Sequence, residues 1–184
     1  EVGSASLGLS QHGGVNLTVT SNDPARVLFS LSPTAAGVPS FTVAIPNGTT
    51  SLSYYVQALE NIVGSTTVTI SATGFTSATR TVNVVPSGVE IHNVPTSTTS
   101  LSADTIFYAQ VGRPNPANTG LSSVQNVRAG GPPFVVTVTN SNAAVAQLKS
   151  DEPAATGQSV SKPIEPNIYY TQWVGTGTLS PYGL

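Results

Sequence analysis

Cysteine and methionine are both missing from the 184 residues of this chain. Without cysteine there can be no disulfide, no thiolate metal site and no cysteine nucleophile. Without methionine, Glu1 is not expected to be a translation start. We therefore expect the chain to be a processed product or a piece of a longer protein.

Charge is also scarce, because only 8% of the residues are charged and the formal net charge is −2. A nucleic-acid-binding domain concentrates Lys and Arg on one face, so this composition argues against nucleic acid as a partner. Neither a long apolar run nor a basic amphipathic stretch is present, so no membrane insertion is expected. Ser, Thr, Asn and Gly supply the polarity instead, and these residues suit solvated strand faces and turns.

Alternation of apolar and polar residues with a period of two dominates the first half of the chain, and no helical stripe accompanies it. In Thr66–Ala72, for example, Val68, Ile70 and Ala72 point one way and the hydroxyl residues between them point the other. Turn residues separate such segments at spacings near ten residues, which is typical of a β-sandwich. The predicted strands are Val15–Thr20, Arg26–Leu31, Ser40–Ile45, Ser51–Ala58, Thr66–Ala72 and Thr79–Val85.

A second series of strands begins near Val89, after a short joint at Pro86-Ser87-Gly88. The pattern therefore predicts an all-β protein of two tandem domains, residues 1–87 and 88–184, each with two antiparallel sheets. A long loop is expected over 114–131. The predicted strands of the second series are Val89–Asn93, Thr105–Val111, Phe134–Thr139, Ala144–Lys149, Ser159–Ile164 and Ile168–Val174.

The two series resemble copies of one unit. Leu17-Thr18-Val19-Thr20 aligns with Val136-Thr137-Val138-Thr139, and after one inserted residue, Asn140, identities continue at an offset of about 120 positions. In this alignment the first domain lacks its first strands and the second lacks its last ones. Two interpretations follow: the chain is a window on a longer array of repeats, or it is a subunit whose open sheet edges are completed by neighbours.

A family resemblance rests on three segments. The run from Ser65 to Phe75, continued through Thr76 to Val84, resembles the closing strand pair of bacterial immunoglobulin-like repeats of the invasin and intimin kind. The turns at 20–25 and 45–50 are similar to turns of the same family. The resemblance covers most of residues 8–85 and more weakly 89–175. It implies tandem immunoglobulin-like sandwiches in a large extracellular surface protein, with no catalytic residues to carry over.

Few residues offer reactive chemistry. His12 and His92 stand far apart, and neither is at metal-ligand spacing from another histidine or a carboxylate. The only adjacent acidic pair, Asp151-Glu152, lacks the dense acidic loop of a calcium site. No nucleophile elbow surrounds any serine. We therefore expect no enzyme, no cofactor and no metal site.

Aromatic residues gather near the end of the chain, at Tyr169, Tyr170, Trp173 and Tyr182. Aromatic faces stack on sugar rings, so Tyr169, Tyr170 and Trp173 are the candidate ligand residues. The alternative, which we favour, is that Trp173 and one of the adjacent tyrosines fill a sandwich core, as Tyr54 or Tyr55 is expected to do in the first copy.

These observations predict a non-catalytic structural repeat of a bacterial cell-surface or extracellular protein: a stalk, an adhesin, or a component of a filament or array. Its partners would be neighbouring repeats or subunits of the same protein, and surface glycans in addition. Two alternatives stay open. One is a carbohydrate-binding accessory module of a secreted enzyme, and the other is a filament subunit assembled by strand complementation.

Overall fold

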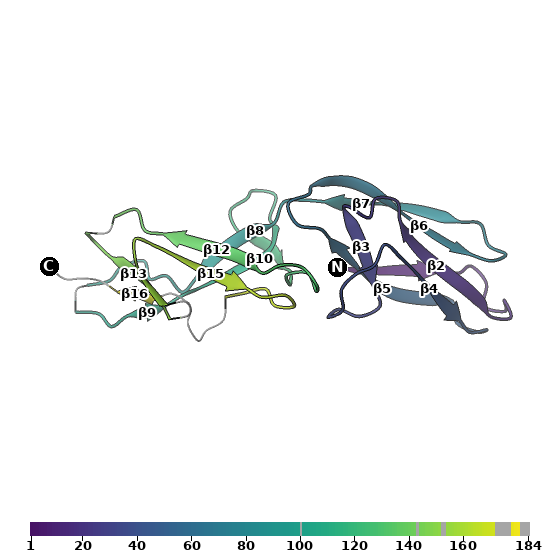
Figure 1. Ribbon diagram of the computed structural model, residues 1–184, viewed down its shortest axis with the longest axis horizontal. Coiled ribbons are helices and arrows are strands. Elements are labelled where there is room, and N and C mark those ends of the chain that lie inside the picture. Colours follow the sequence, from purple (N-terminus) through teal and green to yellow (C-terminus); the bar gives the residue numbers. More distant parts are fainter. Residues whose placement is uncertain (100, 143, 152–153, 172–177, 181–184) are drawn as a thin grey trace. The chain divides into compact units, whose positions relative to one another are not determined.

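The computed structural model describes residues 1–184 except 100, 143, 152–153, 172–177 and 181–184 (Figure 1). The described residues form sixteen β-strands and no helix, and every strand pairing among them is antiparallel. The predicted all-β class is therefore confirmed.

Contacts between residues divide the chain into two compact units. One unit contains Glu1–Pro86 together with Arg128–Gly131, and the other contains Ser87–Val127 and Pro132–Leu184. The two domains expected over 1–87 and 88–184 stay a prediction, because compactness alone does not show that a unit folds by itself.

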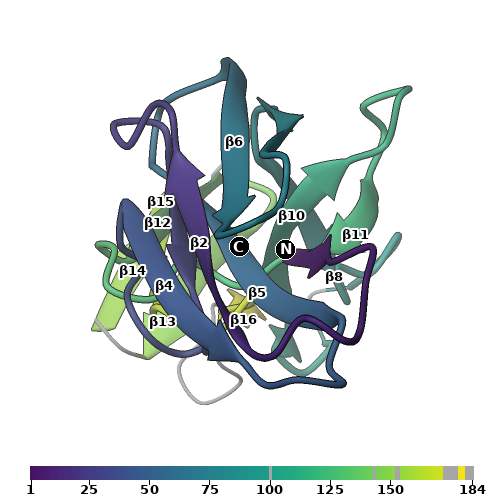
Figure 2. The ribbon, with the colours of Figure 1, turned by 90° about the vertical axis from the view of Figure 1, so that its right-hand side faces the viewer.

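The first unit consists of two sheets. Its smaller sheet has the order β1-β5-β3 and its larger sheet the order β4-β2-β6-β7; in the larger one, β2 lies between β4 and β6 (Figure 2). The strands are β1 (Val2–Ser6), β2 (Val15–Ser21), β3 (Val27–Ser30), β4 (Ser40–Ile45), β5 (Ser51–Ala58), β6 (Gly64–Ala72) and β7 (Ala78–Val84).

The core of the first unit draws on both sheets, which gives it a sandwich-like architecture. Alternation places Leu17 and Val19 of β2 inward, and both are almost fully buried. Phe29 from β3 is fully buried and meets the edge of the Tyr54 ring at a centroid distance of 5.8 Å. Burying each such side chain contributes roughly 2 kcal/mol before the entropy of ordering is subtracted.

The connections of this unit cross between the sheets at every step from β1 to β6, and only β6 and β7 form a hairpin within one sheet. In the constant-type immunoglobulin order, strands A, B, E and D form one sheet and C, F and G the other. The division here is β1, β3, β5 against β2, β4, β6, β7, so the likeness is one of layers and not of strand order. The sequence pattern did not indicate β1, whose small residues Gly3, Ser4 and Ala5 carry a weak alternation.

The second unit has smaller sheets, with the orders β11-β10-β8, β12-β15 and β14-β13-β16-β9. Its strands are β8 (Gly88–His92), β9 (Thr105–Ile106), β10 (Tyr108–Pro114), β11 (Leu121–Val124), β12 (Phe134–Thr139), β13 (Gln147–Asp151), β14 (Ala154–Gly157), β15 (Ser159–Ile164) and β16 (Thr178–Ser180).

Two expectations for the second unit need correction. The segment 114–131 is not all loop, because β11 folds back on β10 as a hairpin. The expected strand Ile168–Val174 is reduced, in its described part, to an isolated bridge between Gln110 and Tyr170. Residues 172–174 lie outside the described part of the chain.

The core of the second unit is divided among its described residues. One cluster contains Ala109, Val111, Val136 and Ile164, and another contains Phe107, Leu148 and Val160, with half-buried Val138 packed against both. The first unit, in contrast, has a single cluster of nine buried residues.

An internal repeat relates the two units at a constant offset of 119 residues. β2 pairs with β4 from Val15↔Ile45 to Thr20↔Ser40, and β12 pairs with β15 from Phe134↔Ile164 to Thr139↔Ser159. Every pair of the second ladder is the pair of the first moved by 119 positions.

Side-chain and turn hydrogen bonds repeat at the same offset. The hydroxyls of Thr18 and Thr42 lie 2.8 Å apart, and those of Thr137 and Ser161 lie 2.7 Å apart. The Ala25 N–H donates to the Asp23 carboxylate, just as the Ala144 N–H donates to the Asn142 amide oxygen. Both units therefore build this region in the same way.

This register corrects the alignment expected from the sequence, which inserted one residue at Asn140. Ser21 N–H donates to Pro39 O, and Asn140 N–H donates to Gln158 O, so Asn140 is the counterpart of Ser21 and not an insertion. Phe29, which bridges Val38, corresponds to Leu148, which bridges Gly157. In a strand, a one-residue slip exchanges the inward and outward faces, so the distinction decides which side chains share a role.

Candidate functional site

Tyr169 and Tyr170 are the two candidate ligand residues within the described part of the chain. Both are half-buried, and their rings meet edge to face, with centroids 5.1 Å apart and planes inclined by 60°. The backbone holds them beside β10, because the Val111 N–H donates to the Tyr169 carbonyl at 2.8 Å. Rings so inclined do not form one flat platform for a sugar, although each ring retains an accessible part.

An aromatic side chain fills the core of the first unit as expected, whereas only some of the aromatic residues of the second unit lie in the described part of the chain. Tyr54 is 5% exposed and packs on Phe29, which confirms the expectation for the first copy. Burial raises the pKa of its phenol, and the charge of Arg80 lowers it by a smaller amount. Neither Tyr169 nor Tyr170 is fully buried, and Trp173 and Tyr182 lie outside the described residues.

His12 has both ring nitrogens engaged in a loop of the first unit. Its Nε2 lies 2.9 Å from the Thr49 carbonyl oxygen, to which it donates, and its Nδ1 accepts a hydrogen bond from the Gly14 N–H at 3.1 Å. This pattern corresponds to the neutral ring with its proton on Nε2. His12 therefore orients the loop around Gly13 and Gly14.

His92 lies on β8 of the second unit. Its ring stacks on that of Tyr108 across the strand pair, with centroids 5.1 Å apart, and its Nε2 is 3.6 Å from Oε2 of Glu90. The structure thus brings His92 to an aromatic neighbour and one carboxylate.

Ion pairs are few among the described residues. Arg128 donates from Nε and Nη2 to the two oxygens of Glu60, each at 2.9 Å, within the first compact unit. Burial by itself raises the pKa of Glu60, but the hydrogen bonds and charge of Arg128 outweigh it and leave that pKa below its ordinary value. Arg26 pairs with Asp23 at 3.1 Å.

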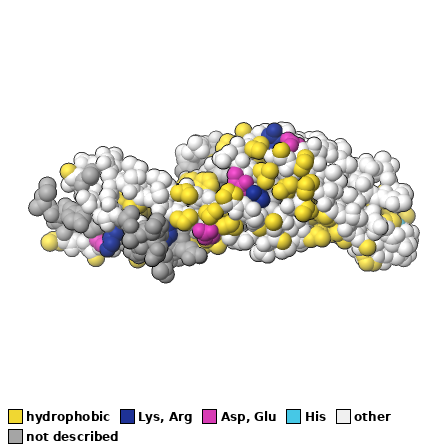
Figure 3. Space-filling model, viewed as in Figure 1, with side chains coloured by type: hydrophobic (Ala, Val, Ile, Leu, Met, Phe, Trp, Pro, Cys, Tyr) yellow, Lys and Arg dark blue, Asp and Glu magenta, His cyan; other side chains and the backbone are white. Residues whose placement is uncertain are grey.

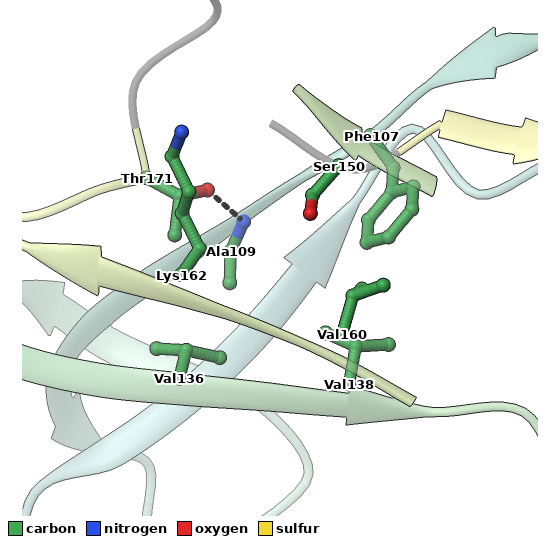
Figure 4. Close-up of a pocket in the computed structure, with 8 residues that line it drawn as sticks. All are labelled: Phe107, Ala109, Val136, Val138, Ser150, Val160, Lys162 and Thr171. Carbon is green, nitrogen blue, oxygen red and sulfur yellow. Dashed lines mark hydrogen bonds between the residues drawn. The ribbon is translucent and has the colours of Figure 1, made fainter. Parts of the chain in front are cut away.

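A small apolar cavity lies in the second unit, between the β12–β15 pair and the segment around Ala109 (Figure 4). Its volume is about 20 Å³, which is close to the space of one water molecule. Val136, Val138 and Val160 point into it from one side and Phe107 from another, while the Ala109 N–H donates to the Thr171 hydroxyl at 3.0 Å. A cavity of this size and lining suits a packing gap better than a small-molecule site.

The surface is mostly uncharged, and Figure 3 shows few Lys, Arg, Asp or Glu side chains on the face in view. Across the described residues, no group of three or more His, Cys, Asp or Glu side chains is placed to hold a metal ion. The same part of the chain contains no helix that is long and apolar enough to cross a bilayer.

The strand edge of β12 is the feature that most resembles a binding site. β12 pairs with β15 on one side, and no other described strand pairs with it, whereas its counterpart β2 pairs on both sides. The sequence pattern predicted open edges at the ends of the units. It did not indicate which strand carries one, because pairing is decided by residues distant in the chain.

Comparison of the chain with protein-family models, with curated proteins and with solved structures found no match.

Proposed function

We propose that this chain is a non-catalytic structural repeat of a bacterial cell-surface or extracellular protein: a stalk, an adhesin, or a component of a filament or array. The observation that supports the proposal is the internal repeat of 119 residues, with the same strand register and the same hydroxyl pairs in both units. Duplicated units joined in one chain are the usual construction of proteins that span a distance or stack into an assembly.

The surface chemistry supports the same role. Ser and Thr side chains occupy two outward positions on each of β2, β4 and their counterparts, and they pair with each other across the strands. The paired hydroxyls keep these positions hydrated, and a low net charge limits repulsion between neighbouring copies.

The finer part of the proposal is that both units are immunoglobulin-like sandwiches related to the bacterial immunoglobulin-like repeats. Seven strands in two antiparallel sheets around one core support it for the first unit. Because the strand order differs from the constant-type order, the proposed relationship concerns the architecture and its use in tandem.

The mechanical part of the function is tested by pulling on the chain between its ends with an atomic force microscope or optical tweezers. A load-bearing repeat should unfold in discrete steps, each releasing about 3.5 Å of contour length per residue freed. Smooth extension at low force, with no discrete step, would count against a load-bearing role.

The location is tested separately, with an antibody raised against the chain and applied to intact cells of the source bacterium. Labelling of unpermeabilised cells, lost after brief treatment with external protease, is the expected result. Labelling that requires permeabilisation would contradict the proposed location.

A further inference from the structure

In the larger sheet of the first unit, β6 pairs with the edge of β2 that corresponds to the open edge of β12. β2 pairs antiparallel with β6 in the register Leu17↔Ala72, Thr18↔Ser71, Val19↔Ile70, Thr20↔Thr69 and Ser21↔Val68. β6 also contributes to the interior, because Val68 is 2% exposed and belongs to the core cluster. A strand in this position therefore supplies both backbone partners and core side chains.

β12 repeats the chemistry of β2 without this cover in the described part of the second unit. Val19 is fully buried, but its counterpart Val138 is only half-buried. Thr18 and Thr20 are half-buried, but Thr137 and Thr139 are exposed. The loss of burial thus occurs at the positions where β6 packs in the first unit.

The backbone groups on this edge can be identified from the alternation along each strand. In the first unit, Ser21 N–H donates to the β4 side and Asn22 N–H donates to Thr67 on the β6 side. Since successive N–H groups point to opposite sides, the N–H groups of Thr18 and Thr20 face β6. Their counterparts, Thr137 and Thr139, face the open edge of β12, the side on which no described strand pairs with it.

The sequence of β12 gives this edge no protection against pairing. Phe134-Val135-Val136-Thr137-Val138-Thr139 contains no charged residue, no proline and no glycine, and all six residues favour strands. Natural sheets usually protect exposed edges with lysine, proline or a bulge. The neighbouring strand β15 does carry Lys162 and Pro163, so protection is present beside β12 and absent from it.

The interior behind β12 is also incompletely filled. The cavity of about 20 Å³ is lined by Val136 and Val138 of β12 and by Val160 of β15. The counterparts of these three residues, Leu17, Val19 and Phe41, belong to or pack against the single core that includes Val68. An added strand with inward β-branched side chains would extend this core.

We propose that the open edge of β12 binds, in trans, an extended segment with the chemistry of β6, in which Val, Ile or Ala face inward and Thr or Ser face outward. The added strand runs antiparallel to β12, with Ala72, Ser71, Ile70 and Thr69 of a β6-type segment opposite Val136, Thr137, Val138 and Thr139. This inference deepens the proposed function and rests on it, because it names the partner through which the repeat assembles.

The experiment uses the absence of cysteine from the chain. The Thr137→Cys variant of the full chain is mixed, under mild oxidation, with a synthetic peptide of the Gly64–Ala72 sequence carrying Ser71→Cys. Because a disulfide forms only when the two Cα atoms are within about 7 Å, cross-linking reports the register. We expect roughly tenfold more cross-linked product than with a peptide carrying Thr67→Cys, whose thiol lies four residues out of register.

A matched control exists within the same chain. Thr18 is the counterpart of Thr137, but its edge is already bonded to β6. The Thr18→Cys variant should therefore give little product with the Ser71→Cys peptide. In parallel, adding the unmodified peptide to the unmodified chain should slow amide exchange at Thr137 and Thr139 and leave Thr18 and Thr20 unchanged.

Three outcomes would overturn the inference. The first is equal cross-linking of the Thr137→Cys and Thr18→Cys variants, and the second is equal cross-linking of the in-register and out-of-register peptides. The third is efficient formation of disulfide homodimers by the Thr137→Cys variant, with a yield that added peptide does not lower. That result would show that the edge pairs with a second copy of the chain. None of these outcomes affects unfolding under force or labelling of intact cells, so the proposed function can fail or stand independently.

Discussion

Single residues decide how closely strands approach in the second unit. Gly112 of β10 lies opposite Val124 of β11, and a Cβ built on Gly112 would stand 2.1 Å from the carbonyl oxygen of Ser123. Because the obstructing atoms belong to the backbone, a rotamer change cannot relieve the clash. Gly112 is therefore required by close packing of the hairpin.

The Gly112→Ala substitution is expected to destabilise the second unit by about 1–3 kcal/mol, the usual cost of forcing additional atoms into a packed region. Thermal unfolding followed by circular dichroism measures the change. Gly8→Ala is the matched control, since no atom lies within 4 Å of a Cβ built there. Equal melting temperatures for the two variants would contradict the packing argument.

The Glu60–Arg128 pair predicts a dependence on pH. The folded state lowers the pKa of Glu60 below its ordinary value of 4.5, so the stabilisation is fully present above that value and is lost as the pH falls through the lower folded-state pKa. Glu60→Gln should destabilise the chain at pH 7 by about 0.2–1 kcal/mol, the usual range for ion pairs near the surface.

The check is a set of melting temperatures of the native chain and of Glu60→Gln between pH 7 and pH 2. The two curves should converge at the acid end, because both side chains are then uncharged. Glu165→Gln, at an exposed position, controls for the change in net charge. A difference that persists unchanged to pH 2 would assign the effect to packing.

At the level of whole strands, the alternation of residues predicts several strand boundaries correctly. Ser40–Ile45, Ser51–Ala58, Phe134–Thr139 and Ser159–Ile164 begin and end where alternation predicts, because each has one buried face and one hydrated face. The repeat was also visible in the sequence. Its register after Asn140 was wrong by one residue, because short identities such as Pro46-Asn47 and Pro166-Asn167 outweighed the pairing that the ladders define.

Hydrogen exchange tests the difference between β2 and β12 at the level of the strand. The amides of Thr18 and Thr20 face β6 and should exchange slowly, whereas those of Thr137 and Thr139 face the uncovered edge and should exchange much faster. Residue-resolved NMR exchange on the free chain measures both pairs in one sample. Similar protection at the four amides would mean that β12 is covered.

At the scale of the molecule, the two units differ in whether the buried residues of each unit form one continuous core. The first has one cluster centred on fully buried residues such as Phe29, and the described part of the second has two smaller clusters that share Val138. More continuous burial of apolar surface stabilises a unit more strongly. The first unit should therefore unfold at the higher temperature.

Differential scanning calorimetry of the native chain and two variants checks this prediction. Phe29→Ala should destabilise the first unit by about 3–5 kcal/mol and shift the transition at higher temperature downward. Leu148→Ala should destabilise the second unit by about 2–5 kcal/mol and shift the other transition downward. Phe29 and Leu148 are counterparts in the repeat, so the pair is matched by position. If Phe29→Ala shifted the transition at lower temperature instead, the first unit would be the less stable one, contrary to the prediction.

The sequence by itself determined the all-β class, the positions of most strands and the presence of a repeat, because alternation and turn residues act over a few neighbouring positions. Only the tertiary structure decided which strands pair, the constant offset of 119 residues, the place of β1 beside β5 and the edge of β12 that no described strand covers. Strand pairing joins residues far apart in the chain, and the choice among possible neighbours depends on how all the strands close around a core together.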